Sequence, residues 1–297
     1  DTKLVVTTDM LLEGIHFDLT YVPLKHLGYK AVVVNISDVA SMYAIPKQIT
    51  VNIAVSSRFS VEAIEELYEG IRLACENYKV DLVGGDTTSS VSGLIISITA
   101  VGFTEPGKVV YRGGAKLNDL ICVTGDLGAA YTGLQILERE KQVFLADPTM
   151  QPQLSDKEYI VSRQLKPEAR MDVIYELREM GIVPTSMIDI SDGLASELLH
   201  ICTQSKVGAR VYEDNFPIDN MTFETAREFN LDPLTCMMNG GEDYELLFTL
   251  DQSHYEKIKN NPNITIIGHI TEASTGVNLV SKGGNVVPVT AQGWVHF

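Results

Sequence analysis

Five short acidic segments of this sequence could bind cations. Each joins one or two carboxylates to small or hydroxyl residues beside an apolar run: Thr7-Thr8-Asp9, Asn35-Ile36-Ser37-Asp38, Gly84-Gly85-Asp86-Thr87, Asp189-Ile190-Ser191-Asp192-Gly193 and Gly240-Gly241-Glu242-Asp243. Carboxylate and hydroxyl oxygens are hard ligands that suit Mg²⁺, which bridges protein carboxylates to phosphate oxygens. We interpret the five segments as turns beside strands or helices. They predict an enzyme that uses Mg²⁺ together with a nucleotide.

The familiar nucleotide-binding patterns are missing from the sequence. It contains no G-x-x-x-x-G-K-[ST] loop, no G-x-G-x-x-G after a strand and no kinase catalytic loop. The segment that starts at Asp189 is not a calcium-binding EF-hand loop, because its twelfth position is His200 rather than Glu. Phosphates would therefore have to be held by metal ions, by backbone donors at glycine turns and by basic residues such as Arg112.

Strands and helices alternate along the chain, with several unassigned stretches between them. Apolar runs and turn residues predict strands over 4–8, 48–56, 94–103, 120–124, 208–213 and 245–250. Helical patterns cover 24–42, the segment from Ser60 as N-cap to Tyr78, 129–140, 167–180, 194–205 and 223–229. The tail over 264–287 reads as short strands and turns. This mixture predicts α+β or α/β layers rather than a strict parallel barrel.

A turn-rich Gly113-Gly114 divides the chain into two expected domains. We predict an N-terminal domain over 1–113 that binds ATP and Mg²⁺, and a C-terminal α/β domain over 114–297. The segment 144–156, rich in Pro and Gln, is predicted to be a loop, and the sequence does not indicate its role. An I-S-D core followed by Ala-Ser occurs at 35–41 and again at 189–196, which hints at two related halves.

Composition excludes several classes of protein. With 39 acidic and 23 basic residues the net charge is −16, which argues against a nucleic-acid partner, since that would need a basic stripe. The longest uncharged apolar stretch, 94–103, is about half of what a bilayer span requires, so no membrane partner is expected. The four cysteines are widely spaced and lie among apolar neighbours, which predicts buried thiols in a soluble, cytoplasmic protein.

Six ordered blocks resemble one enzyme family. They are TTDMLLEGIHFD, GYKAVVVNISDVASM, GGDTT, YRGGAK, MIDISDGLASEL and NGGEDYELLFT, and they span residues 1 to about 250. Together they resemble the thiamine-monophosphate kinases, which belong to the superfamily of aminoimidazole ribonucleotide synthetase and selenophosphate synthetase. The resemblance implies a two-domain fold whose N-terminal domain forms a β-barrel-like interface in a homodimer. It also implies an ATP-dependent phosphorylation of thiamine monophosphate to thiamine diphosphate.

The resemblance also implies roles for individual residues. Those implied to bind several Mg²⁺ ions are Asp9 with Thr7 and Thr8, Asp38, Asp86, Asp189 and Asp192. Those implied to contact ATP are Tyr68, Gly85, Asp86, Arg112 and Ser191. Those implied to contact thiamine monophosphate are His16, Glu242, which would meet the aminopyrimidine, and Trp294, which would stack on the rings. No catalytic general base is expected, because the attacking phosphate oxygen is already deprotonated near neutral pH.

The sequence departs from the family pattern in two places. The family begins with a Gly-Asp-Asp block that supplies a further carboxylate, and this chain starts just after that point, so we expect an upstream segment. The block after Arg112 has Asn118 where the family has a Pro-Gly-Asp turn, and Asn tolerates a left-handed turn conformation. Two alternative functions stay open here: a ligase of the aminoimidazole ribonucleotide synthetase type, and a non-catalytic nucleotide or metal sensor.

Overall fold

The computed structural model describes residues 2–291 and divides the chain into two compact units. The first runs to Val109 and takes up two later segments, Leu137–Gln153 and Leu165–Met171. The second consists of Val110–Ile136, Leu154–Gln164 and the chain from Asp172 onward. The boundary proposed at Gly113-Gly114 lies near the first crossing between the units, whereas no sequence pattern indicated the later crossings.

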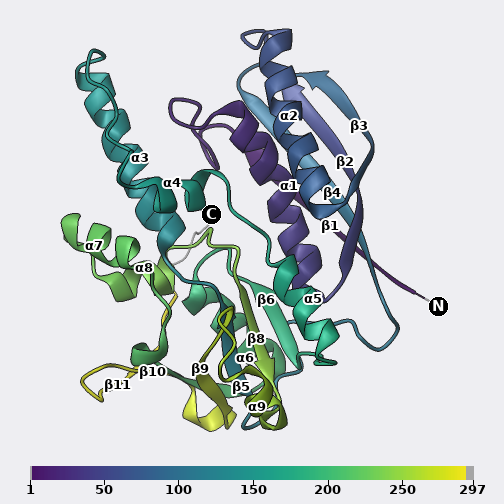
Figure 1. Cartoon of the computed structure of the whole chain (residues 1–297), viewed down its shortest axis with the longest axis vertical. Coiled ribbons are helices and arrows are strands. Elements are labelled where there is room, and N and C mark those ends of the chain that lie inside the picture. The colour runs from purple at the N-terminus through teal and green to yellow at the C-terminus, as the bar shows by residue number, and fades with distance from the viewer. Residues whose placement is uncertain (1, 292–297) are drawn as a thin grey trace. The chain divides into compact units, whose positions relative to one another are not determined.

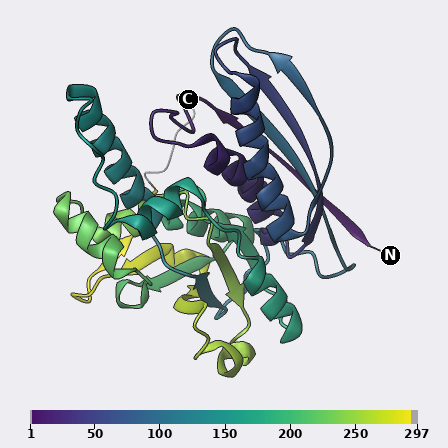
Figure 2. The same ribbon diagram turned by 45° about the horizontal axis from the view of Figure 1, so that its top comes forward.

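Unit 1 is a four-stranded sheet covered on one face by two helices (Figures 1 and 2). The strands follow the order β1-β4-β2-β3; β4 is antiparallel to both neighbours, and β2 and β3 are parallel. Their bounds are β1 Lys3–Leu12, β2 Ile45–Val55, β3 Asp81–Ser89 and β4 Leu94–Thr104, and the helices are α1 Leu24–Ser41 and α2 Val61–Tyr78.

Two glycines let the helices of unit 1 approach each other closely. A Cβ at Gly28 of α1 would lie 2.0 Å from the carbonyl oxygen of Leu67, and one at Gly70 of α2 would lie 1.8 Å from that of Lys25. Only glycine fits such backbone contacts. Most of α1 is consequently buried, including the run Ala31–Ile36. The predicted cap of α2 is confirmed, because the Ser60 hydroxyl accepts the Ala63 N–H at 3.3 Å.

Unit 2 contains a seven-stranded mixed sheet in the order β11-β10-β7-β9-β5-β8-β6. The strands are β5 Leu120–Thr124, β6 Ser186–Asp189, β7 Gly208–Tyr212, β8 Leu246–Leu250, β9 Ile264–Thr271, β10 Val277–Val280 and β11 Val286–Pro288. The later helices are α3 Ala129–Ala146, α4 Glu158–Leu165, α5 Met171–Glu179, α6 Leu194–Ser205, α7 Asn220–Glu228, α8 Pro233–Asn239 and α9 Tyr255–Ile258. Short 3₁₀ turns cover Glu213–Asn215, Gln252–His254 and Ala273–Thr275.

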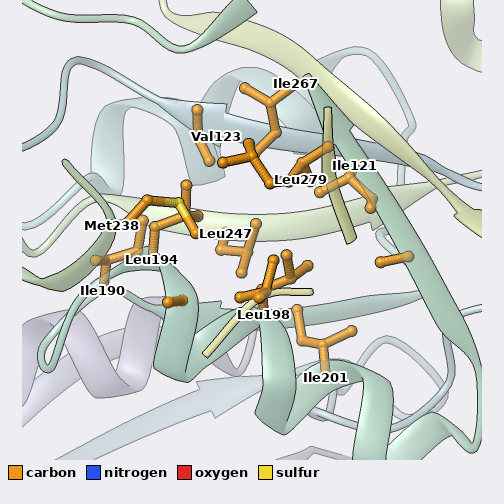
Figure 3. Packing of buried hydrophobic residues seen from close by; sticks show 14 of the residues in the cluster. Ile121, Val123, Ile190, Leu194, Leu198, Ile201, Met238, Leu247, Ile267 and Leu279 are labelled. Atoms are coloured by element: carbon orange, nitrogen blue, oxygen red, sulfur yellow. The ribbon is translucent and has the colours of Figure 1, made fainter. Parts of the chain in front are cut away.

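The core of unit 2 lies between this sheet and α6. Figure 3 shows Leu194, Leu198 and Ile201 of α6 packed toward Ile121 and Leu247 of the central strands. Each of these five side chains is fully buried. Apolar burial of this kind contributes roughly 25 cal/mol per Å², and it fixes the start of α6, which is where one of the acidic segments lies.

The mixed α/β class is confirmed, and the helices predicted at 194–205 and from Ser60 to Tyr78 agree with α6 and α2. Five strands and helices were missed: β3, β6, α4, α8 and α9. The interpretation of all five acidic segments as turns was wrong for three of them. Asp9 lies within β1, Asp38 within α1 and Asp86 within β3, because the surrounding chain is paired or packed in regular structure. The loop predicted at 144–156 begins later, since α3 continues to Ala146.

The predictions about cysteines and Asn118 are confirmed. All four cysteines are free and buried, and Asn118 has a left-handed φ of 68°. Across residues 2–291, no helix is both long enough and apolar enough to cross a membrane.

Candidate functional site

In unit 1, two carboxylates meet where β1 faces α1. The Thr7 hydroxyl donates to Asp38 Oδ2 at 2.5 Å, and the backbone N–H of Asp9 donates to Asn35 Oδ1 at 3.1 Å. Burial, together with the smaller effect of the neighbouring Asp38, raises the pKa of Asp9 to about 6. The structure therefore brings together Thr7, Asp9 and Asp38, as a pair of mutually repelling carboxylates with a hydroxyl beside it.

Thr8 and Asp86 point away from that pair, to the other face of the sheet. Along β1, successive side chains alternate between faces, so Thr8 points opposite to Asp9. Asp86 lies on the same face as Thr8, as the strand register across the sheet shows. Thr8 pairs with Thr99, and Thr99 pairs with Thr50. Asn52, two residues after Thr50 and therefore on the same face of β2, pairs with Asp86. Both side chains are exposed. The sequence did not indicate this separation, because it depends on strand register.

Gly85, also on β3, has a steric reason to be glycine. It is in register with Val51, and a Cβ there would lie 1.8 Å from the carbonyl oxygen of that residue. The close approach accounts for Gly85 without a ligand, so its implied contact with ATP stays a prediction. Tyr68, which lies on α2 and is partly buried, likewise stays a prediction.

The loop after β1 holds His16 in one orientation. The Leu12 N–H donates to His16 Nδ1 at 3.0 Å, so the neutral ring carries its proton on Nε2. The loop is fastened to the second half of α3, because Lys141 pairs with Asp18 at 2.8 Å and the Tyr21 hydroxyl donates to Glu138 Oε1 at 2.8 Å. His16 is thus presented by an anchored loop.

In unit 2, the second I-S-D segment joins β6 to α6. Asp189 ends β6 and is buried, whereas Ser191 is exposed and Asp192 is partly exposed. Ile190 and Leu194, on either side of the loop, point into the core (Figure 3). The core thus holds both ends of the short loop that displays Ser191 and Asp192.

A buried carboxylate that sequence reasoning missed supports this loop. Glu197 of α6 is 2% exposed, and its Oε1 accepts the backbone N–H of Asp192 at 3.2 Å. Its Oε2 is buried without a hydrogen-bond partner. Burial raises the pKa of Glu197 to about 8, and the negative charges of Asp192 and Asp189 also raise it. One sequence signal could have identified Glu197. It is an acidic residue in the first turn of a helix, where the side chain can accept a backbone N–H from the segment that precedes the helix.

The segment Gly240-Gly241-Glu242-Asp243 is a loop, as predicted, and it presents its acidic residues in two directions. Asp243 is buried and accepts the backbone N–H groups of Gly128 at 2.8 Å and Ala130 at 3.4 Å, at the start of α3. Glu245 is fully buried and pairs with Arg163 of α4 at 2.7 Å. Glu242 is the member of this group that stays partly exposed, so it is the one able to meet a ligand.

Hydrogen bonds between main-chain groups join this loop to the I-S-D loop. Glu242 N donates to Ser191 O at 2.7 Å, Tyr244 N donates to Ile190 O at 2.9 Å, and Ile190 N donates to Glu245 O at 2.7 Å. They continue the antiparallel pairing of β6 with β8. The predicted metal ligand Asp192 and the predicted substrate contact Glu242 therefore lie on two adjacent, mutually fastened segments.

Two predicted residues remain, Arg112 and Trp294. Arg112 is exposed in a segment whose following residues, Gly114 and Ala115, both donate backbone N–H groups to the Ser205 hydroxyl at 3.1 Å. Trp294 lies outside the described residues.

Over residues 2–291, no group of three or more His, Cys, Asp or Glu side chains is arranged to hold a metal ion. The carboxylates instead form separate small groups, Asp9 with Asp38 in unit 1 and Asp189 with Asp192 in unit 2.

The donors in these groups fit a hard divalent cation. Asp9, Asp38 and Thr7 offer only oxygen atoms, and burial, followed by repulsion from Asp38, disfavours the ionised form of Asp9 and raises its pKa. A nearby cation would relieve that repulsion. Burial is the main cause of the raised pKa of Glu197, and the charges of Asp192 and Asp189 add to it, so a cation near these two aspartates would be favoured as well.

Comparisons with known proteins agree with the two-unit organisation. Residues 1–104 match the AIR synthase related protein, N-terminal domain, and residues 116–278 match the corresponding C-terminal domain. The chain is 34% identical to thiamine-monophosphate kinase of Aquifex aeolicus, over 99% of this chain and 88% of the relative, and 32% identical to that of Bacillus subtilis with the same coverage. The solved structure of AaThiL complexed with AMPPCP and TMP superposes with a TM-score of 0.86 at 31% identity, covering 100% of this chain and 88% of that one.

Glu197 generates a prediction about stability and pH. Because its folded-state pKa is raised from 4.5 to about 8, the folded state holds the proton more tightly, and wild-type stability falls as pH rises between those values. Glu197→Gln keeps the acceptor for Asp192 N but carries no charge. Urea unfolding in chelator should show the variant gaining on the order of 3 kcal/mol over wild type between about pH 5 and pH 8. Glu224→Gln, at an exposed position of α7, is the control. If the stability of the wild type and of Glu197→Gln changes with pH in the same way, the raised pKa of Glu197 is wrong.

Proposed function

The chain belongs to the thiamine-monophosphate kinases of the AIR synthase related protein family, and we propose that it transfers the terminal phosphoryl group of ATP to thiamine monophosphate. The product is thiamine diphosphate. The observation that carries this proposal is the relationship to these kinases over nearly the whole chain, in both units. A relative of the same fold has been solved with AMPPCP and TMP together, which supports direct transfer between a nucleotide and this substrate.

The proposed reaction does not need a general base. A phosphate monoester has its second pKa at about 6, so its oxygen is already a nucleophile near neutral pH. The obstacle is the approach of two anionic phosphates, and the protein must hold them in line. When bound, Mg²⁺ would neutralise phosphate charge. The proposed ligands of several Mg²⁺ ions lie in separate groups: Asp9 and Asp38 with Thr7; Thr8 and Asp86 on the other face of the unit 1 sheet; and Asp189 with Asp192 in unit 2.

The substrate and nucleotide contacts are also proposals. His16, with its proton on Nε2, would donate to thiamine monophosphate, and the partly exposed Glu242 would accept from the amino group of its pyrimidine. Trp294 is proposed to stack on the rings. For the nucleotide we propose Arg112, an exposed cation able to bind phosphate, together with Tyr68, Gly85 and Ser191.

We further propose a homodimer in which the uncovered face of the unit 1 sheet is the interface. Leu4, Val6 and Met10 of β1 are 59%, 57% and 54% exposed, and Phe103, in register with Leu4, is 37% exposed. Because α1 and α2 cover the other face, these apolar side chains form an exposed patch on two paired strands, in which Thr8 lies between Val6 and Met10. We propose a second copy of the chain as the occupant of this exposed apolar face.

The activity is tested with the complete protein, ATP, Mg²⁺ and thiamine monophosphate, followed by chromatography with fluorescence detection after oxidation. Thiamine diphosphate should form only when all three small components are present. Formation of ADP without thiamine diphosphate would contradict the proposed acceptor and favour a ligase-type reaction. Nucleotide binding without turnover would favour a sensor.

The carboxylate pair of unit 1 predicts that metal affinity depends on pH. Because burial and Asp38 raise the pKa of Asp9 to about 6, a proton competes with Mg²⁺ below that pH, and the affinity should fall up to about tenfold per pH unit. Calorimetric titration with Mg²⁺ near pH 5 and pH 7.5, without nucleotide, measures the change. Asp9→Asn should bind Mg²⁺ weakly with little pH dependence, whereas Asp81→Asn, at an exposed position of β3, should behave as wild type. Equal wild-type affinity at both pH values would contradict the prediction.

The dimer proposal is tested by light scattering coupled to size exclusion. Val6→Glu places a charge in the centre of the exposed apolar patch, so we expect it to shift the protein from dimer to monomer. Val286→Glu serves as the matched control, because Val286 is also 54% exposed but lies on β11 of unit 2. A monomeric wild type, or a dimer unaffected by Val6→Glu, would rule out this interface.

A further inference from the structure

The environment of Glu242 contains a second polar side chain that neither the sequence nor the resemblance indicated. Gln164, near the end of α4, donates from Nε2 to Glu242 Oε2 at 2.7 Å. Gln164 is only 6% exposed, so it reaches the carboxylate from the protein interior, whereas Glu242 itself is partly exposed. A hydrogen bond from an amide to a carboxylate is charge-assisted and directional.

We propose that Gln164 is the positioning residue that fixes the carboxylate of Glu242 for recognition of the substrate's aminopyrimidine. The inference rests on the proposed function, since it assigns a task to a residue beneath the same site. The Gln164 amide fixes one carboxylate oxygen and therefore sets the plane in which the other oxygen can accept a proton donor from the substrate. A side-chain amide suits this task because it carries no charge of its own and cannot compete as an ion pair.

The peptide backbone around Glu242 shows why such a fixing group is needed. Glu242 and Tyr244 both have positive φ angles, 57° and 53°, which non-glycine residues rarely adopt. The loop is held in this conformation from the inside by Asp243 and Glu245. These anchors fix the main chain but not the rotamers of the long Glu242 side chain, which Gln164 restrains.

Helix α4 is itself well placed to hold Gln164 still. The preceding residue, Arg163, pairs with the buried Glu245 at 2.7 Å and donates from Nη2 to the carbonyl oxygens of Asp243 at 3.2 Å and Asp126 at 3.3 Å. Consecutive residues of α4 thus contact the same loop, with Arg163 holding its main chain and Gln164 its exposed carboxylate. Arg163 therefore supports the stability of the loop, whereas Gln164 supports the orientation of the substrate. Experiments can distinguish the two roles.

The test compares Michaelis constants and competitive binding for two variants of Gln164. Gln164→Met preserves the length and packing of the side chain but donates no hydrogen bond, and we expect it to raise the KM for thiamine monophosphate about tenfold. The KM for ATP should stay within about twofold, because Glu242 is proposed to contact thiamine monophosphate rather than the nucleotide. Gln164→Glu, which places a second carboxylate against Glu242, should raise the KM for thiamine monophosphate further.

Unphosphorylated thiamine supplies the readout that a purely structural role would not produce. It carries the same rings without the phosphate, so its inhibition constant should rise by the same factor as the KM for thiamine monophosphate in Gln164→Met. Loss of metal or phosphate positioning would leave thiamine binding unchanged. Lys157→Met is the matched control, because it removes the contacts of Lys157 with Glu228 and Thr225 just before α4 but leaves Gln164 in place.

The outcomes separate this inference from the proposed function. If the wild type makes thiamine diphosphate but Gln164→Met shows unchanged constants, or a shift no larger than that of Lys157→Met, the positioning role is wrong and the kinase function stands. An equal rise in the KM for ATP would also overturn the positioning role. If the wild type makes no thiamine diphosphate, both the proposed kinase function and the role assigned to Gln164 are wrong.

Discussion

Repulsion between carboxylates that lie close together and partly out of water is the constraint around which this protein is built. The chain carries a net charge of −16, and although many of its acidic side chains are exposed, a few lie close together in partly buried places. Each is stabilised in a different way. Asp243 receives backbone N–H groups at the start of α3, Glu245 receives the guanidinium of Arg163, and burial favours the protonated form of Glu197. The pair Asp9 and Asp38 instead retains repulsion that a cation could relieve.

The same short motif is used in two different structural settings. The first I-S-D lies inside the buried helix α1, so that Asp38 projects toward a neighbouring strand. The second follows the end of β6 and leads into α6. The same short sequence motif therefore adopts a different local structure in the two places. What the two settings share is a rigid, well-packed support behind a carboxylate, which a site for metal and phosphate needs because small displacements weaken charge positioning.

Backbone hydrogen bonds join two loops whose proposed ligands differ. Because the segments after β6 and before β8 stay paired beyond the strands, Ser191 and Glu242 are fixed relative to each other. A side chain proposed for the nucleotide and one proposed for the substrate thus share one rigid ribbon. Such preorganisation reduces the entropy that would otherwise be lost on bringing two reactants together.

Sequence alone determined the mixed α/β class, the ends of the strongly patterned helices and the family, since these depend on local periodicity, caps and ordered motifs. Ser60 as a cap and the helix 194–205 were readable for this reason. Only the tertiary structure decided which residues meet. Strand register put Thr8 and Asp86 on the opposite face from Asp9, and long-range packing brought Arg163 and Gln164 beneath the loop that holds Glu242 and Glu245, far away in the chain. Contacts of this kind depend on pairing between distant segments, which no local pattern of residue types encodes.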